Sequence, residues 1–563
     1  MAFVLHAKSV ITMNPRAPAA EAVAVRDGRI AEVGSLPEVT AAAGEGAERV
    51  DLGDAAVLPA FIDAHHHYSL AAFDRRTPDL HMEPGASVED LLEQVEKAAA
   101  SGGDGWLRLQ GYDPSKLRER RAPTAAEIDS VCPKRPVLLI AYSFHDGCLN
   151  SPGLAEMGWD RNSTDPPHGV LARDRRGELT GEVSEAALFL AEARSRGSLL
   201  ARGEDAWMAE CEEHGESLLA AGIARVGDPT VPPAFERLYE RAAADGRLPL
   251  TVHRMPVGEA TVLEPRFEGD PTGAGPAQAP VGPVKIFVDG AERCAVCLSM
   301  TQVARAAART LRAAVGGEGL AAIRAARNSP KLRFHRDGLL HGGELFWAQE
   351  PLDAAVSTAA ERGFQVAQHA IGNEAIERAV TAIERSGAAL DRAPGRPRLE
   401  HVMLLDEPMC RRIAATGAIA VVQPFLIYDT VGDVMALTPL PPPLIVKPLR
   451  SLLDAGVTLA GSSDHPVSDF DVLAGIRAAV TRATRGGRVC EPEQAITVDD
   501  ALRAYTLGSA KALGVAHEAG SLEPGKRADI VVLSRDPRLV DPDDYAGISV
   551  LRTYVAGRLA YRP

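Results

Sequence analysis

Short apolar runs alternate with longer helical stretches through the middle of the chain, from Val57 to about Ala510. A strand that is buried on both faces is typically a short apolar run, and strands that alternate with helices predict parallel βα units. Nine runs have this character: Val57–Asp63, Pro136–Tyr142, Ile223–Asp228, Leu248–Arg254, Val284–Asp289, Phe364–His369, Arg398–Val402, Ala418–Gln423 and Val457–Ser463.

A closed (β/α)8 barrel uses eight strands, so one of the nine runs has to lie elsewhere. Pro136–Tyr142 is the best one to exclude, because it lies in a region rich in Pro, Gly and Arg where helical patterns are sparse. We therefore predict an α/β fold built on a (β/α)8 TIM-type barrel. The region 72–204 is predicted to be an insertion subdomain that follows the first barrel strand.

Both ends of the chain carry short strand patterns outside this central region. Residues 2–56 contain several such runs, with a hairpin signal at Arg26-Asp27-Gly28, and Ala528–Leu533 and Val550–Val555 are their counterparts near the C-terminus. Neither end alone has enough apolar surface for a core, so the ends are predicted to share one small β-sandwich. The predicted domains are 1–56 plus 511–563 (composite β-sandwich), 57–71 plus 205–510 (catalytic barrel) and 72–204 (insertion).

Two further segments are predicted to embellish the barrel. The Ala-rich run Gln302–Arg327 is typical of a helix, broken at Gly316-Gly317, and shows no strand pattern around it. The proline-rich segment 439–443 predicts a semi-rigid loop over the barrel mouth.

Composition narrows the classes of partner. The chain has 563 residues and a formal net charge of −15, which argues against binding nucleic acid or an anionic membrane and favours a small-molecule substrate. No apolar run is long enough for a membrane span and no secretory signal is recognisable, so a cytoplasmic location is expected. Seven cysteines do not form a disulfide pattern, and the sequence leaves a homo-oligomer open.

Chemistry-bearing residues recur at the ends of the predicted strands. His65 and His67 end the first strand and share a face, while His66 points away. Taken singly, a histidine here is more often a core residue than a ligand, and an aspartate before a proline is often a helix cap. Their joint recurrence at one end of the barrel strands is the signal, and it is continued by Lys285, His369, His401 and Asp464.

This set resembles the amidohydrolase superfamily, whose first strand carries His-x-His and whose later strands carry Lys, His, His and Asp in this order. The stretches Lys285–Gly290, His369–Gly372 and Ser463-Asp464-x-Pro466 are similar to the amidohydrolase-3 branch, which includes N-substituted formamide deformylases. Gly520–Asp529 also matches a common superfamily ending. Departures occur at Ala60 and Asn373, where the family usually has Gly and Asp.

The resemblance implies a metal-dependent hydrolase that cleaves the C–N bond of an amide, formamide or cyclic amide. By this resemblance, His65, His67 and Asp464 bind one divalent ion, zinc being expected, and His369 and His401 bind a second. Lys285 would bridge the two ions as its carbamate. Asp464 would act as the proton shuttle for a metal-activated hydroxide.

Two alternatives remain open. A mononuclear zinc deaminase would leave Lys285 unmodified, whereas a metal-bound binding protein without catalysis would not need Asp464 as a proton shuttle. Substrate contacts are expected from His145, which resembles a histidine of the branch, and from aromatic side chains on loops, namely Tyr68, Trp106 and Tyr428.

Overall fold

The computed structural model describes residues 2–563 except 76, 84, 101, 103, 104, 202, 260, 292, 314, 316–331, 433, 434 and 436–440. Its described core contains one parallel sheet of three strands, in the order β13-β12-β6, and one of five, in the order β14-β18-β19-β21-β23. The strands are β6 (Phe61–Asp63), β12 (Ile223–Val231), β13 (Thr251–Pro256), β14 (Val284–Phe287), β18 (Val366–Ala370), β19 (Arg398–His401), β21 (Ile419–Val422) and β23 (Thr458–Gly461).

Backbone hydrogen bonds also connect the edges of these two sheets. The Ala64 amide, just after β6, donates to the Gly461 carbonyl of β23 over 3.2 Å. At the other edge, the Gly282 amide, just before β14, donates to the Arg254 carbonyl of β13 over 2.6 Å. Each of the eight runs assigned to the core therefore contributes a strand to one of the two sheets, in chain order, as the alternation of strands and helices predicted.

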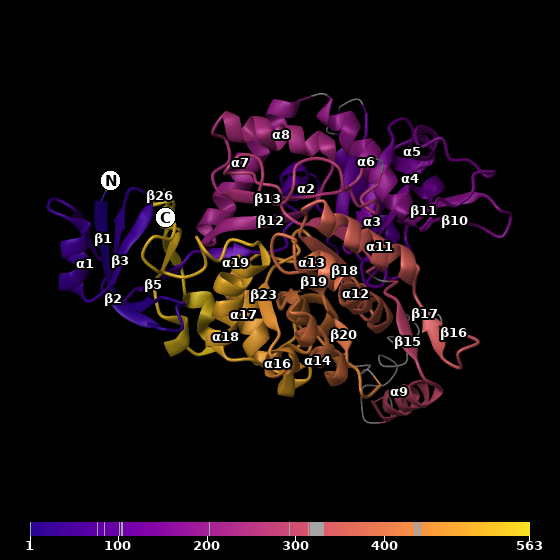
Figure 1. Ribbon diagram of the computed structural model, residues 1–563. Helices are drawn as coiled ribbons and strands as arrows, with labels where there is room; N and C mark the ends of the chain where they lie inside the picture. Colours follow the sequence, from indigo (N-terminus) through magenta and orange to yellow (C-terminus); the bar gives the residue numbers. More distant parts are fainter. Residues whose placement is uncertain are drawn as a thin grey trace.

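Amphipathic helices cover the outer side of these strands (Figure 1). In α8, Phe235, Leu238, Tyr239 and Ala242 are buried at helical spacing, so one stripe of the helix packs on the core. The covering helices are α7 (Glu204–Ala220), α8 (Pro233–Ala244), α11 (Gln349–Glu361), α12 (Asn373–Arg385), α14 (Glu407–Thr416), α16 (Leu449–Asp454) and α17 (Val472–Thr481).

The first predicted strand is divided between two sheets, which corrects the prediction of one continuous strand over Val57–Asp63. Ala56–Pro59 forms β5 and pairs with β24, whereas β6 begins at Phe61 and pairs with β12. The Ala60 amide donates to the Asp529 carbonyl over 3.0 Å and the next amide donates to Gly222 over 2.9 Å, so the chain changes partner within one residue.

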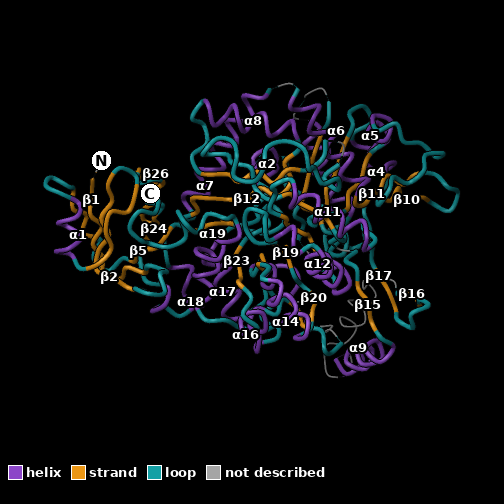
Figure 2. Tube along the Cα trace, in the orientation of Figure 1, coloured by secondary structure: helices purple, strands orange, loops and turns teal. Residues whose placement is uncertain are grey.

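Both chain ends lie in one eight-stranded sheet, in the order β26-β25-β24-β5-β1-β2-β3, with β4 paired to β1. Figures 1 and 2 show this sheet beside the core, with the two termini close together. The shared sheet agrees with the pairing of ends predicted from sequence, and helix α1 (Leu36–Ala43) packs against it. The two-layer sandwich stays a prediction. The strands are β1 (Ala2–Ile11), β2 (Ala19–Arg26), β3 (Arg29–Gly34), β4 (Glu48–Asp51), β5 (Ala56–Pro59), β24 (Ile530–Leu533), β25 (Val550–Val555) and β26 (Arg558–Tyr561).

A stacked aromatic pair joins the two ends of the chain and allows a stability test. The rings of Phe3 and Tyr554 are buried, with centroids 5.2 Å apart. Tyr554→Ala is expected to lower the free energy of unfolding by about 3 kcal/mol, because it removes a buried ring and exposes Phe3. Tyr554→Phe, which removes only a hydroxyl, is the control. Equal denaturant midpoints for the two variants would show that the ends fold independently.

The predicted insertion contains a separate five-stranded sheet, in the order β10-β11-β9-β8-β7. The excluded run Pro136–Tyr142 forms β8 in this sheet, outside the core, as predicted. Helices are less sparse here than predicted, since α3 (Val88–Ala100) and α6 (Ala186–Leu200) are long. The remaining elements are β7 (Leu107–Tyr112), β8 (Val137–Ala141), β9 (Asp146–Leu149), β10 (Gly169–Arg173), β11 (Leu179–Glu185), α4 (Ala125–Val131) and α5 (Ser151–Glu156).

A helix and a small additional sheet follow β14 in the chain. Helix α9 covers Met300–Ala313, and the predicted helix break at Gly316-Gly317 lies outside the described residues, as do the first two residues of the predicted loop 439–443. The prediction that this region contains no strands was wrong. An antiparallel sheet forms here from β15 (Val296–Leu298), β17 (Leu340–Gly342) and β16 (Arg333–Phe334). Across the described part of the chain, no helix combines the length and apolarity needed to cross a membrane.

Candidate metal centre

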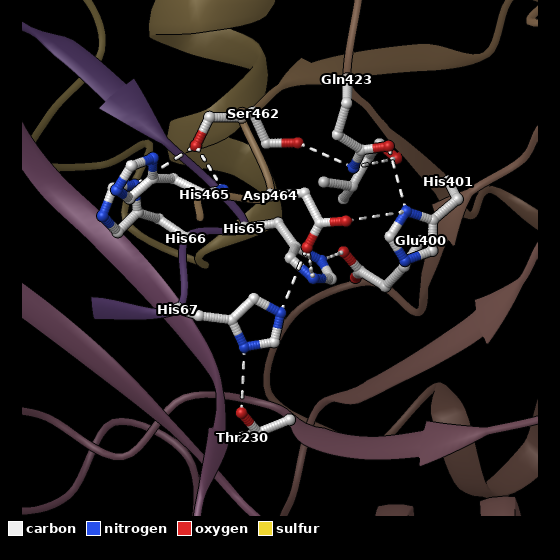
Figure 3. Close-up of polar contacts among 12 residues, drawn as sticks. His65, His66, His67, Thr230, Glu400, His401, Gln423, Ser462, Asp464 and His465 are labelled. Atoms are coloured by element: carbon white, nitrogen blue, oxygen red, sulfur yellow. Dashed lines mark hydrogen bonds and ion pairs between the residues drawn. The ribbon is translucent and has the colours of Figure 1, made fainter. Parts of the chain in front are cut away.

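Three predicted ligands converge beyond the carboxyl ends of β6 and β23. Nε2 of His65 lies 3.1 Å from Oδ1 of Asp464, and Nε2 of His67 lies 3.2 Å from the same oxygen. One ligand atom from each of the three residues falls within 4.8 Å of the others. Figure 3 shows dashed lines from the Asp464 carboxylate to both imidazoles. His65 and His67 thus come together as predicted, although both lie just after the last residue of β6 and not within the strand.

Each of these imidazoles is oriented by a hydrogen bond at its other nitrogen. Nδ1 of His65 lies 2.6 Å from Oε2 of Glu400, and Nδ1 of His67 lies 3.0 Å from the Thr230 hydroxyl. Burial lowers the pKa of His67, which favours the neutral imidazole. A neutral ring held at Nδ1 offers Nε2 as a metal ligand.

The two carboxylates of the site are held in their ionised form. Burial opposes ionisation of Glu400, but Arg398, His65 and Lys285 outweigh it and keep its pKa below the usual range. The Nε group of Arg398 donates to Oε1 of Glu400 over 2.8 Å. Burial likewise opposes ionisation of Asp464, yet His65, His67 and His401 hold its pKa well below the usual range. Anionic oxygen therefore faces the imidazole nitrogens.

His369 and His401 extend the cluster from β18 and β19. Their ring centroids are 4.5 Å apart, and the His401 ring is 5.0 Å from the His65 ring. Nδ1 of His401 lies 3.1 Å from Oε1 of Gln423 and 3.9 Å from Oδ2 of Asp464. Burial lowers the pKa of both histidines well below the usual range. Both rings are therefore neutral at physiological pH.

Lys285 is 1% exposed on β14 and lines the same cavity. Its Nζ lies 4.8 Å from the Phe287 ring centroid, and burial lowers its pKa to about 8. The described structure therefore collects all six residues predicted as ligands, namely His65, His67, Lys285, His369, His401 and Asp464, around one cavity.

Unpaired nitrogen atoms test whether these residues suit a metal ion. Within the described residues, Nε2 of His65 and Nε2 of His369 are sealed from solvent and complete no hydrogen-bond geometry, although they face carboxylate oxygens of Asp464 and Asp289 at 3.1 and 3.7 Å. A buried polar atom without a partner costs about 1–3 kcal/mol, so such atoms are rare unless an unseen partner compensates. Imidazole nitrogens beside a carboxylate oxygen are the donors that zinc and similar divalent ions prefer. The residues fit a divalent metal.

Two of the candidate ligands have a left-handed backbone. His401 has φ 73° and Asp464 has φ 63°, a region that residues other than glycine seldom adopt. Such conformations cost free energy and collect at functional sites, where the surrounding structure enforces them. Both side chains are turned into the cavity at the point where their strands end.

The cavity holds about 690 Å³ of empty space, including the part open to solvent. Besides the candidate ligands, side chains of the insertion contribute to its wall. The insertion residues that line it are Ser143, Phe144, His145, Phe189, Glu192 and Arg196.

His145, predicted as a substrate contact, lies in this wall. Its ring centroid is 6.1 Å from that of His369, and its Nδ1 lies 2.7 Å from Oε2 of Glu185. Glu185 has φ 50°, and a Cβ at Gly290 would come within 2.3 Å of its carboxylate, so glycine is needed there. The structure thus orients His145 beside the candidate ligands.

The other three predicted contacts do not line the cavity, which corrects the sequence interpretation. Tyr68 is fully buried in the core and its hydroxyl donates to the Cys211 carbonyl. Trp106 packs in the core of the insertion. The Tyr428 ring lies tilted against the Phe425 ring and faces two arginine side chains. Aromatic rings near strand ends were needed for packing between layers, which sequence position does not distinguish from a place in the cavity.

His66 points to the opposite side, as predicted. Its Nε2 lies 2.8 Å from Nε2 of His214, and its Nδ1 lies 3.1 Å from Oδ2 of Asp63. Figure 3 shows His66 beside His465 and away from Asp464.

His66→Ala is therefore expected to keep its bound metal while losing on the order of 2 kcal/mol of stability, because buried partners lose a hydrogen bond. Metal content by mass spectrometry and thermal melting check both parts. A variant that loses metal but melts like the wild type would contradict the assignment.

Sequence reasoning missed the residues that orient the histidines, namely Thr230, Glu185, Glu400 and Gln423. One signal was present for Glu400. Arg398 and Glu400 alternate in β19, whose sequence is Arg-Leu-Glu-His, and both are fully buried. Two charges on one face of a buried strand indicate a paired role, although the partner His65 cannot be identified from spacing.

Parallel strands with buried His and Asp side chains at their carboxyl ends define an α/β protein with a hydrolase-type metal site. The family model described as "Amidohydrolase family" matches residues 48–561, and the chain belongs to this family. It is accordingly a hydrolase that acts on C–N bonds.

Known relatives match over nearly the whole chain. The chain is 32% identical to the N-substituted formamide deformylase of Arthrobacter pascens, covering 98% of this chain and 97% of the relative. It is 27% identical to the putative amidohydrolase YtcJ of Bacillus subtilis, covering 100% and 99%. An uncharacterized metal-dependent hydrolase from Pyrococcus horikoshii has the same fold, with a TM-score of 0.70, 23% identity and coverage of 96% and 99%.

Proposed function

We propose that the protein hydrolyses the C–N bond of an N-substituted formamide or a related small amide or cyclic amide. The observation that carries the proposal is the convergence of His65, His67 and Asp464, with ligand atoms within 4.8 Å, at one cavity. The similarity to a protein named N-substituted formamide deformylase supports the choice of bond.

In this proposal His65, His67 and Asp464 hold one divalent ion, and His369 and His401 hold a second. Zinc fits the nitrogen and oxygen donors. Lys285, as its carbamate, would help to hold both ions, and its lowered pKa of about 8 supports this, because the neutral amine is the form that reacts with carbon dioxide. We further propose that the eight core strands close into one barrel, supported by the hydrogen bonds between the edges of the two sheets.

The chain's own residues would divide the chemistry. A bound divalent ion supplies a Lewis acid that polarises the carbonyl and lowers the pKa of water. Asp464, ionised because its pKa is well below the usual range, accepts the proton of the attacking water and then gives it to the leaving nitrogen. Glu400 and Thr230 keep His65 and His67 in place through their Nδ1 atoms. His145, held by Glu185, contacts the substrate from the insertion side.

Removal of metal tests this function directly. Prolonged chelation is expected to abolish release of amine and formate from an N-alkylformamide, and added zinc is expected to restore it, since the donor set requires a cation. Assaying ammonia from amino-substituted heterocycles in parallel tests the mononuclear deaminase. Full amide hydrolysis by metal-free protein would overturn the proposal, and turnover confined to the heterocycles would establish the deaminase instead.

A further inference from the structure

Helix α6 presents one face to the cavity. Phe189, Glu192 and Arg196 follow each other at spacings of three and four residues, and all three line the cavity. The Phe189 ring lies 5.3 Å from the His145 ring and 6.4 Å from the Phe287 ring, so this end of the face adjoins the candidate metal centre. At about 1.5 Å per residue, Arg196 lies roughly 10 Å farther along the helix axis.

The Arg196 guanidinium has an edge without a protein partner. The residue is 5% exposed, and its Nη1 donates to Oε1 of Glu192 over 3.1 Å. Its Nε and Nη2 make no hydrogen bond to any residue that the structure describes. Neither atom is sealed from solvent, whereas the unpaired Nη2 of Arg225 is sealed. Arg196 lines the cavity, and these two N–H groups are its solvent-accessible donors without a protein acceptor. Nε and Nη2 point side by side and match the two oxygens of a carboxylate.

The carboxylate that pairs with Arg196, that of Glu192, is also close to a second arginine. Oε1 of Glu192 is also 3.7 Å from Nη2 of Arg108. That same Nη2 bonds both oxygens of Asp74, over 3.1 and 3.2 Å, so Asp74 is already paired. Among the described residues, Glu192 is the carboxylate within ion-pair distance of Arg196, and Arg196 shares it with Arg108. A buried cation with a shared partner is stabilised when an anion completes its hydrogen bonds.

We propose that Arg196 is a specificity residue that binds a carboxylate of the substrate remote from the scissile bond. The inference rests on the proposed amide hydrolysis and names its substrate class, which is a small amide whose apolar body ends in a carboxylate. Phe144, Phe189 and Phe287 line the intervening space and suit such an apolar body.

A matched pair of substrates tests the inference, with N-formyl-6-aminohexanoate as the acid and its methyl ester as the neutral partner. Arg196→Gln is expected to raise KM for the acid roughly tenfold to a hundredfold, with kcat and the kinetics of the ester unchanged. Arg194→Gln is the control, because Arg194 lies on the same helix but is exposed, with its Nη2 3.3 Å from Glu156. Equal KM values for the acid in both variants would overturn the inference.

Equilibrium binding separates this inference from the proposed function. Calorimetric binding of hexanoate to metal-loaded protein is expected to weaken in Arg196→Gln and to persist in Arg194→Gln. Carboxylate binding at the metal would be equal in the two variants and would argue against Arg196. If no amide is hydrolysed but hexanoate binding depends on Arg196, the proposed function fails and the Arg196 site stands.

Should Arg196→Gln not fold, Arg196→Lys decides, because it keeps the charge but lacks the paired N–H edge. Unchanged preference for the acid in Arg196→Lys would overturn the inference.

Discussion

His67→Ala is expected to lose its bound metal and to retain less than about 1% of wild-type hydrolysis. His67 provides one of the three ligand atoms that lie within 4.8 Å of one another, and its Nε2 is 3.2 Å from Asp464. With His67 removed, His65 and Asp464 alone would have to hold the ion. Metal content per chain and the rate of amide hydrolysis, measured on the same preparation, check the prediction.

His253→Ala is the matched control for this experiment. His253 is also a buried histidine of the core, on β13, with its Nε2 unpaired. It does not line the cavity, and burial together with Arg225, Arg398 and Arg527 lowers its pKa to about 3. The control is expected to cost stability and keep its metal. Equal metal loss in both variants would mean that the loss follows from general destabilisation.

Lys285→Ala is expected to bind one metal fewer than the wild type and to lose activity by roughly a hundredfold or more. The variant lacks the amine that would carry the carbamate bridge. A short carboxylic acid in solution is expected to restore part of the metal content and part of the activity. Lys447→Ala is the control, because Lys447 is equally buried and burial lowers its pKa to about 7, yet it does not line the cavity. A single tightly held metal with near-normal turnover in Lys285→Ala would favour the mononuclear site.

The lowered pKa of Lys285 also gives this bridge a pH dependence. A lysine with a pKa of about 8 gains neutral amine as pH rises through 8, and the neutral amine takes up carbon dioxide. Loading of the second metal in bicarbonate is therefore expected to increase from about pH 7 to about pH 9. The metal content per chain after reconstitution at each pH measures this loading. A metal content that does not change over this pH range would contradict a carbamate.

Much of the architecture was accessible from local pattern. The eight core strands were recognisable because a strand buried on both faces must be apolar along its length, and that requirement applies to each run separately. The placement of Pro136–Tyr142 outside the core followed from its surroundings in sequence. The candidate ligands were recognisable for a related reason, since parallel strands place their carboxyl ends at one edge.

Other features depended on partners far away in the chain. The strand predicted over Val57–Asp63 is divided because its amides meet Asp529 on one side and Gly222 on the other. The tautomer of His65 depends on Glu400, a residue 335 positions away. No spacing rule connects such positions.

The sequence by itself determined the class of fold, the order of strands and the residues able to bind a metal, because periodicity and residue chemistry are local properties. Only the tertiary structure decided which aromatic side chains pack in the core and which line the cavity. It also placed Arg196 in the wall of the same cavity as His65 and Asp464. The physical reason is that burial and hydrogen bonding are set by neighbours in space, which folding selects from all parts of the chain.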